Sequence, residues 1–189
     1  MIVPGIIKLA RGNAKGADEF SGTPESLTAS LAPFIAFPLV GAVITSVSGD
    51  WKIAVMVFFS RLCGVLVLPV LVYEFSRIFD RKAYWLRTAT ALNWCYWLAL
   101  PAAIVAIILM MVAVSCGLPQ EFSEIAAIIL TGVYLLWNRW FILKAGLQLN
   151  GWRAGLILLV SLILSGIFSF LPALAVGMKL AGMDGTPLP

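Results

Sequence analysis

The chain has 189 residues, of which 61% are hydrophobic and 12% are charged, and its formal net charge is +4. A soluble domain averages roughly 45–50% apolar and about 25% charged residues, so a soluble fold would lack the polar residues needed to cover its surface. The mean hydropathy of +1.00 agrees with this comparison. We therefore expect lipid to be the solvent of this protein.

The composition also excludes several kinds of chemistry. The chain has no histidine, which removes imidazole as a general base, a proton shuttle or a metal ligand. Cys63, Cys95 and Cys116 are scattered thiols without a C-x-x-C motif, and we interpret them as small hydrophobic residues. The sequence contains no nucleotide-binding loop, G-x-S-x-G, H-E-x-x-H or clustered metal ligands. We expect a protein without enzymatic activity that uses no cofactor and no metal and binds no nucleic acid.

The first 25 residues are predicted to be a cytoplasmic tail. They do not resemble a signal peptide, because the apolar patch is short and the charges follow it. Apolar residues recur at helical spacing, which leaves two alternatives: a short helix lying on the inner leaflet, or a disordered tail. The tail precedes a predicted helix start, with Thr23 as N-cap, Pro24 at the first position and Glu25 in the first turn.

Five apolar runs are long enough to cross a bilayer, which takes about 20 residues each. The predicted spans are residues 27–47, 53–73, 89–115, 125–143 and 154–178. Short connections make consecutive helices antiparallel neighbours. The predicted fold class is an all-α, polytopic transmembrane helical bundle of five spans. It occupies residues 26–178, between the tail of residues 1–25 and a short extracytoplasmic tail of residues 179–189.

Basic residues gather on one side of the predicted membrane. Ten of them lie in or beside the tail, the second loop and the fourth loop: Lys8, Arg11, Lys15, Arg77, Arg81, Lys82, Arg87, Arg139, Lys144 and Arg153. The other side holds only Lys52 and Lys179. Because cytoplasmic loops carry an excess of lysine and arginine, we predict a multi-pass protein of the bacterial inner (cytoplasmic) membrane with its N-terminus in the cytoplasm.

Arg61 is a cation inside the second predicted span. An arginine at the bilayer centre costs about 2.5–3.5 kcal/mol on insertion scales, so an intramembrane arginine is a candidate functional residue. Arg61 lies nine residues after Lys52, and Tyr134 lies nine residues after Ile125 on a helix that also starts outside. We predict that Arg61 faces the bundle interior and meets Tyr134. The alternative is that Arg61 snorkels to the outer headgroups.

A second group of polar residues is expected at the inner leaflet. Glu74, Asn93, Asn138 and Arg139 are predicted to converge in one layer. Glu74 and Arg139 form the predicted ion pair, because neither charge should remain alone in a medium of low dielectric constant.

Tryptophans are concentrated near the same interface. Trp94 and Trp97, and likewise Trp137 and Trp140, are three residues apart and share a helix face. We interpret them as an aromatic belt at headgroup level, and the alternative is a wall that faces a lipid ligand.

Small residues occur four positions apart in two parts of the last span. Gly151 is followed by Gly155 at this spacing, and Ser161 by Ser165 and Ser169. This spacing favours close helix packing, either within the bundle or across a dimer.

The arrangement of the spans resembles the Yip1-like membrane proteins, including their bacterial members. The resemblance covers residues 25–178 and includes span number, spacing, orientation and the polar, aromatic start of the third span at Asn93–Trp97. The D-L-Y-G-P-type segment of the eukaryotic members is absent. The resemblance implies a protein without enzymatic activity that binds partners or shapes membranes, and it implies no particular site residue.

The sequence leads to three hypotheses about function. The first is a non-catalytic integral membrane protein that acts as a scaffold, assembly factor or accessory subunit through helix–helix contacts, with the lipid bilayer and either a protein partner or a second copy as its partners. The second is a small-solute transporter or channel in which Arg61 faces the path. The third is a lipid-modifying enzyme that uses the inner aromatic and polar layer, although the missing histidine and carboxylate pairs argue against it.

Overall fold

The structure is a computed structural model that describes residues 2–48 and 51–180. Within these residues the chain is helical and contains no strand. Five stretches are long and apolar enough to cross a membrane: Pro24–Ile44, Ala54–Ile78, Lys82–Ser115, Gln120–Gly146 and Gly151–Phe168. The prediction of an all-α protein with five spans is confirmed.

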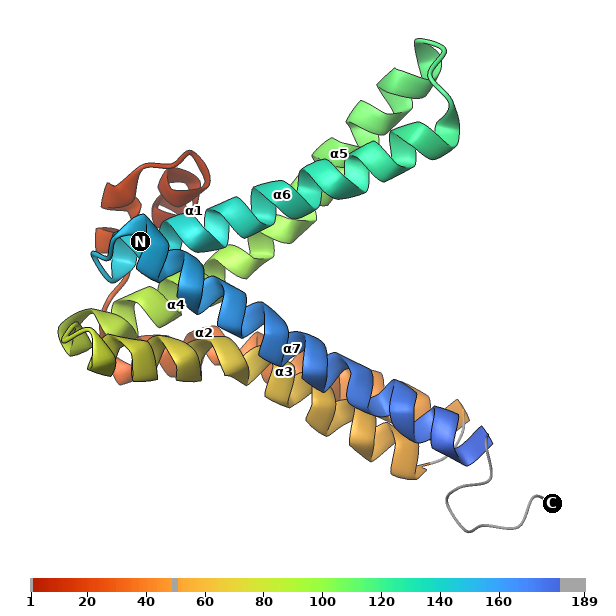
Figure 1. The fold of residues 1–189 in the computed structure, drawn as a ribbon, viewed down its shortest axis with the longest axis horizontal. Helices are drawn as coiled ribbons and strands as arrows, with labels where there is room; N and C mark the ends of the chain where they lie inside the picture. Colours follow the sequence, from red (N-terminus) through yellow and green to blue (C-terminus); the bar gives the residue numbers. More distant parts are fainter. Residues whose placement is uncertain (1, 49–50, 181–189) are drawn as a thin grey trace.

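The long helices form two arms that diverge from one end of the molecule (Figure 1). The first arm consists of α2 (Pro24–Ser48), α3 (Trp51–Ile78) and α7 (Gly151–Leu180), and the second arm consists of α5 (Ala99–Ser115) and α6 (Gln120–Gly146). We call the end where the arms meet the vertex. The N-terminal segment, the α3–α4 loop and the α6–α7 turn all lie there, so the ten basic residues of the predicted cytoplasmic side share one end of the molecule.

The short helix α4 (Trp85–Cys95) occupies the vertex. It packs against α1, α2, α3 and α6, and its residues from Thr88 to Asn93 are all buried. A helix that is buried at six successive positions is enclosed on every side. The first arm, the second arm and the N-terminal segment are therefore joined through α4.

The third span is not one continuous helix, although the sequence predicted a single run over residues 89–115. α4 ends at Cys95, the 3₁₀ turn η3 covers Tyr96–Leu98, and α5 starts at Ala99. Pro101 explains the break, because it has no N–H to donate and its ring clashes with the carbonyl of the residue four positions earlier, Trp97. α5 then continues from the vertex into the second arm (Figure 1).

Small residues bring α3 and α7 close together in the first arm. The hydroxyl of Ser60 donates a hydrogen bond to the carbonyl of Phe168, and the hydroxyl of Ser165 donates to the carbonyl of Gly64 at 3.4 Å. Ser165 of the last span therefore contributes to packing within the bundle, and packing of the small residues across a dimer stays a prediction. The side chain of Ser169 is outside the described part of the structure.

The helix α2 begins where the sequence predicted. Thr23 Oγ1 accepts a hydrogen bond from the backbone N–H of Ser26 at 3.3 Å, Pro24 is the first helical residue, and Glu25 lies in the first turn. An N-cap side chain satisfies one of the helix donors that has no partner within the helix. The predicted helix start is confirmed.

The N-terminal segment is folded rather than disordered. It consists of α1 (Ile2–Ala10) and the 3₁₀ turn η1 (Ala14–Glu19), which pack against each other and against α4 and α6. Leu9 is fully buried, while Ile2, Val3 and Ile7 remain exposed. The helix of the first alternative is present, the disordered tail is wrong, and the position of the exposed face in the inner leaflet stays a prediction.

Candidate functional site

Two polar side chains of α6 hold the end of α1. The amide of Asn138 is buried and donates to the carbonyl of Leu9 at 3.2 Å, and the hydroxyl of Tyr134 donates to the carbonyl of Ala10 at 3.1 Å. The last carbonyls of a helix have no partner within the helix, so they need donors from elsewhere. Asn138 and Tyr134 supply such donors, and the carbonyl of Leu9 also accepts from the backbone N–H of Gly12 at 3.0 Å.

Arg61 and Tyr134 do not meet, so the predicted pairing is wrong. Arg61 is exposed on α3 of the first arm, with its guanidinium beside Gly41 of α2. Tyr134 lies on α6 of the second arm and reaches α1. An equal number of residues from the outer ends of two helices predicts a similar depth in the membrane, but it does not predict where the side chains point. The two residues are also separated because they lie on different arms.

The predicted pair of Glu74 and Arg139 is also wrong. The carboxylate of Glu74 lies 3.6 Å from the guanidinium of Arg77, one turn along the same helix. The guanidinium of Arg139 lies over the ring of Tyr96, 5.6 Å from its centroid. Glu74 therefore pairs with a base on its own helix and not with a base on α6.

Asn93 lies at the vertex, as Asn138 and Arg139 do, but it bonds to a different helix. Its buried amide donates to the hydroxyl of Ser30 on α2 at 2.9 Å. The predicted single layer therefore divides into an α2–α4 contact through Asn93 and an α1–α6 contact through Asn138. Glu74 belongs to neither contact.

The four predicted interface tryptophans have different surroundings. Trp140 packs inside, where its indole N–H donates to the carbonyl of Gly151 at 2.9 Å. The indole nitrogen of Trp94 is buried, and Trp97 is half-buried. Trp137 is 40% exposed and stacks on Phe141. The tryptophans thus contribute to packing at the vertex, and the aromatic belt stays a prediction.

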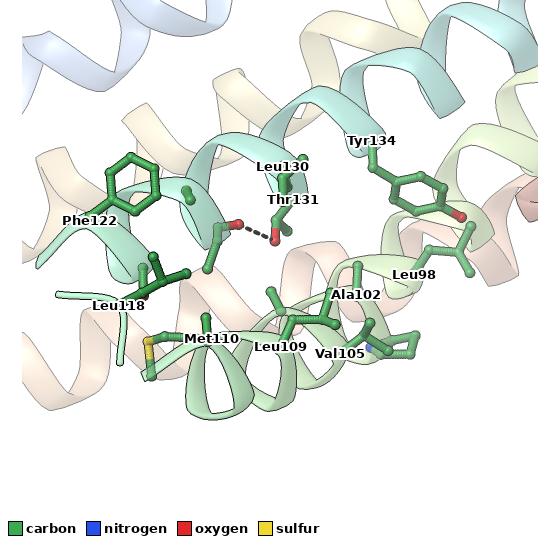
Figure 2. Close-up of a pocket in the computed structure, with 16 residues that line it drawn as sticks. Leu98, Ala102, Val105, Leu109, Met110, Leu118, Phe122, Leu130, Thr131 and Tyr134 are labelled. Carbon is green, nitrogen blue, oxygen red and sulfur yellow. Dashed lines mark hydrogen bonds between the residues drawn. The ribbon is translucent and has the colours of Figure 1, made fainter. Parts of the chain in front are cut away.

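A groove of about 580 Å³ runs between α5 and α6 (Figure 2). One wall of the groove is formed by residues between Leu98 and Ala113, and the other wall by residues between Phe122 and Tyr134. The side chains that line the groove are almost all apolar. The hydroxyls of Ser123 and Thr131 donate to carbonyls of their own helix, as the dashed line in Figure 2 shows for Thr131. The α5–α6 groove therefore offers little to a polar ligand along most of its length.

A smaller cavity of about 160 Å³ continues the same seam toward the vertex. Its lining includes Cys95, Tyr96, Asn138 and Arg139. The two cavities are lined by consecutive residues, Leu98 and Ala99 on one side and Tyr134 and Leu135 on the other, so they follow each other along the helices. We call the smaller one the Arg139 cavity.

A family model matches most of the chain. The model of the Yip1 domain matches residues 14–171, a range that starts in η1 and includes most or all of every span. The chain belongs to the Yip1 domain family. No curated protein and no solved structure matches it. The resemblance drawn from span number and spacing is confirmed, and this Yip1 domain is a multi-pass membrane protein.

The described part of this Yip1 domain contains no group of three or more His, Cys, Asp or Glu side chains that could hold a metal ion. Neither cavity pairs an acid with a base or a nucleophile. The arrangement offers an apolar groove beside α5 and a cation, Arg139, in the cavity that continues it.

Several residues that organise the Yip1 domain were missed from the sequence. Leu9, Ser30 and Thr88 are buried at the vertex, where they contact Asn138, Asn93 and the backbone at Gly146. Gly146 was visible in the sequence as a glycine near the end of the fourth span, but a glycine alone does not reveal that Thr88 is its neighbour. Ser30 and Leu9 gave no signal, since a serine and a leucine fit many other positions equally well.

Proposed function

We propose that this Yip1 domain is a non-catalytic scaffold, assembly factor or accessory subunit that binds a helix of another membrane protein along α5. The observation that supports this function is the isolation of α5. None of its 17 residues is buried, and its main contacts are with α6 and the preceding η3 turn. Much of the apolar surface of α5 is therefore free to contact a partner helix.

The free side of α5 has the pattern of a helix-packing surface. Leu100, Ile104, Ile107, Met111 and Val114 are all exposed, and their spacing alternates between four and three residues. This spacing places the five side chains in one stripe, which is the pattern that packs against a second helix. None of the five lines the α5–α6 groove. We call them the α5 stripe.

The position of Arg61 favours a scaffold over a transporter. Arg61 lines neither the α5–α6 groove nor the Arg139 cavity. The larger cavity is apolar, and apolar walls oppose the passage of a polar solute because its lost hydrogen bonds are not replaced. A role of Arg61 in a solute path therefore has little support from the described residues.

We also infer that the vertex faces the cytoplasm of a bacterial inner membrane. The ten basic residues at the vertex support this orientation. Reporters fused to each end should report opposite compartments, with the N-terminus inside. If both ends lie in one compartment, the proposed orientation is wrong.

Purification from the native membrane in a mild detergent tests the scaffold function. The wild-type chain should carry one partner at a fixed stoichiometry, and Ile104→Trp on the α5 stripe should release it. Ile163→Trp on α7 is the matched control, because Ile104 and Ile163 are 59% and 55% exposed. The proposal is contradicted if no partner is present, or if both substitutions release it equally.

A further inference from the structure

We propose that the seam formed by the α5–α6 groove and the Arg139 cavity binds one anionic phospholipid, with an acyl chain in the groove and the phosphate at Arg139. This inference does not depend on the scaffold function, because the α5 stripe lies outside the groove.

The groove has the dimensions and lining that an acyl chain requires. From Phe122 to Tyr134 the lining of α6 advances 12 residues, or about 18 Å at helical rise. Small side chains such as Ala102, Ala106 and Ala127 keep the groove open between the two helices. An apolar groove of this kind gains by filling with hydrocarbon, since unfilled space gives up dispersion contacts.

Arg139 supplies the charge at the inner end of the groove. Three other cations at the vertex have carboxylate partners, Lys8 with Glu19, Arg77 with Glu74, and Arg87 with Asp18, and most of the remaining ones are exposed. Arg139 is half-buried and lines a cavity. Among the described residues, Arg139 has no carboxylate and no hydrogen-bond acceptor, and its guanidinium lies over Tyr96. A partly buried guanidinium without a counter-charge is costly, and its planar donors suit a phosphate group.

The continuity of the two cavities points to a lipid rather than a soluble anion. A soluble anion would use the Arg139 cavity and leave the groove unfilled. A phospholipid fills both parts, because its phosphate and its acyl chain are covalently joined and a membrane supplies it at high local concentration. Asn138 already donates to Leu9, so Arg139 carries the recognition of the headgroup.

The headgroup is tested with purified protein and an equimolar mixture of phosphatidylglycerol and phosphatidylcholine with the same acyl chains, with bound lipid counted by native mass spectrometry. We expect the wild type to retain one phosphatidylglycerol in preference. Arg139→Gln should reduce its retention about tenfold, the loss of one charge-assisted contact. Arg61→Gln removes an intramembrane arginine that lines neither cavity and should leave retention unchanged. Equal retention of the two lipids by the wild type, or equal loss in both variants, would overturn the inference.

The acyl chain is tested with a second pair of variants, which also decides the question if Arg139→Gln does not fold. Ala106→Phe fills the groove, whereas Ala103→Phe places the same ring on the exposed side of α5, outside the lining. We expect Ala106→Phe to lose the bound lipid and Ala103→Phe to keep it. If the two variants retain lipid equally, no acyl chain occupies the groove.

Discussion

Asn138 and Leu9 are 129 residues apart in the sequence, and the amide of Asn138 donates to the backbone carbonyl of Leu9 at 3.2 Å. Both residues are buried. This bond joins the fourth span to the N-terminal helix and makes residues 2–20 part of the membrane domain. The position of α1 is therefore fixed by contacts with α6, and it does not depend on binding of α1 to the lipid surface.

Removing the Asn138 amide should loosen α1. In Asn138→Leu the carbonyl of Leu9 loses this donor, and we expect the docked segment to lose about 1–2 kcal/mol of stability. Hydrogen exchange of residues 2–20 measures this change. Thr131→Val is the control on the same helix, because the Thr131 hydroxyl bonds only to its own helix at Ala127. Equal exchange in the two variants would show that Asn138 does not hold α1.

The bond between Asn93 and Ser30 should appear as a coupling between α4 and α2. In a double-mutant cycle with Asn93→Ala and Ser30→Ala, we expect a coupling energy of about 0.6–1.7 kcal/mol, the range of interhelical hydrogen bonds in membranes. Unfolding in mixed micelles gives the four free energies. The cycle of Ser30→Ala with Asn138→Ala should be additive, since that asparagine bonds to Leu9 instead. Additivity in the first cycle would contradict the contact.

Gly146 and Gly132 form a matched pair on α6. A Cβ at position 146 would lie 2.5 Å from Thr88 Oγ1, whereas a Cβ at position 132 has no neighbour within 4 Å. Overpacking a tight contact costs about 1–3 kcal/mol, and replacing a helical glycine with alanine where the added Cβ has free space gains up to about 1 kcal/mol. We expect Gly146→Ala to lower the unfolding midpoint and Gly132→Ala to leave it unchanged or raise it. If both changes have the same sign, the close approach of α4 and α6 is wrong.

The N-terminal segment should loosen in acid. The pKa of Glu19 is lowered from its ordinary value of 4.5, chiefly because Lys8 donates a hydrogen bond to its carboxylate and secondly because the charge of Lys8 lies beside it. A carboxyl whose pKa is lowered on folding stabilises the fold above its unfolded pKa and loses that contribution as the pH falls through the folded pKa.

Hydrogen exchange of residues 2–20 between pH 7 and pH 3 measures this effect. After correction for the intrinsic rate, protection should fall once the pH drops below about 4.5, the unfolded pKa. Glu19→Gln should be less protected at neutral pH and should lose less protection on acidification than the wild type. A wild-type protection that is independent of pH would exclude a contribution from this ion pair.

The sequence predicted the spans because lipid imposes long apolar runs, and it predicted the start of α2 because Thr23, Pro24 and Glu25 combine three independent signals. The pairing of polar residues was less predictable. Arg61 and Tyr134 were matched by depth, but no pattern along the chain reveals that the helices diverge into two arms and keep these two residues apart. Ser30 and Leu9 became partners of Asn93 and Asn138 only through that arrangement.

A photo-cross-linking amino acid at position 104 tests most directly whether the α5 stripe binds a partner helix. Exposure to light in intact native membranes should produce one protein adduct of defined mass from position 104. The same probe at position 163, on an equally exposed part of α7, should produce none. If position 104 yields only lipid adducts, or if both positions yield the same protein adduct, α5 is not the binding surface.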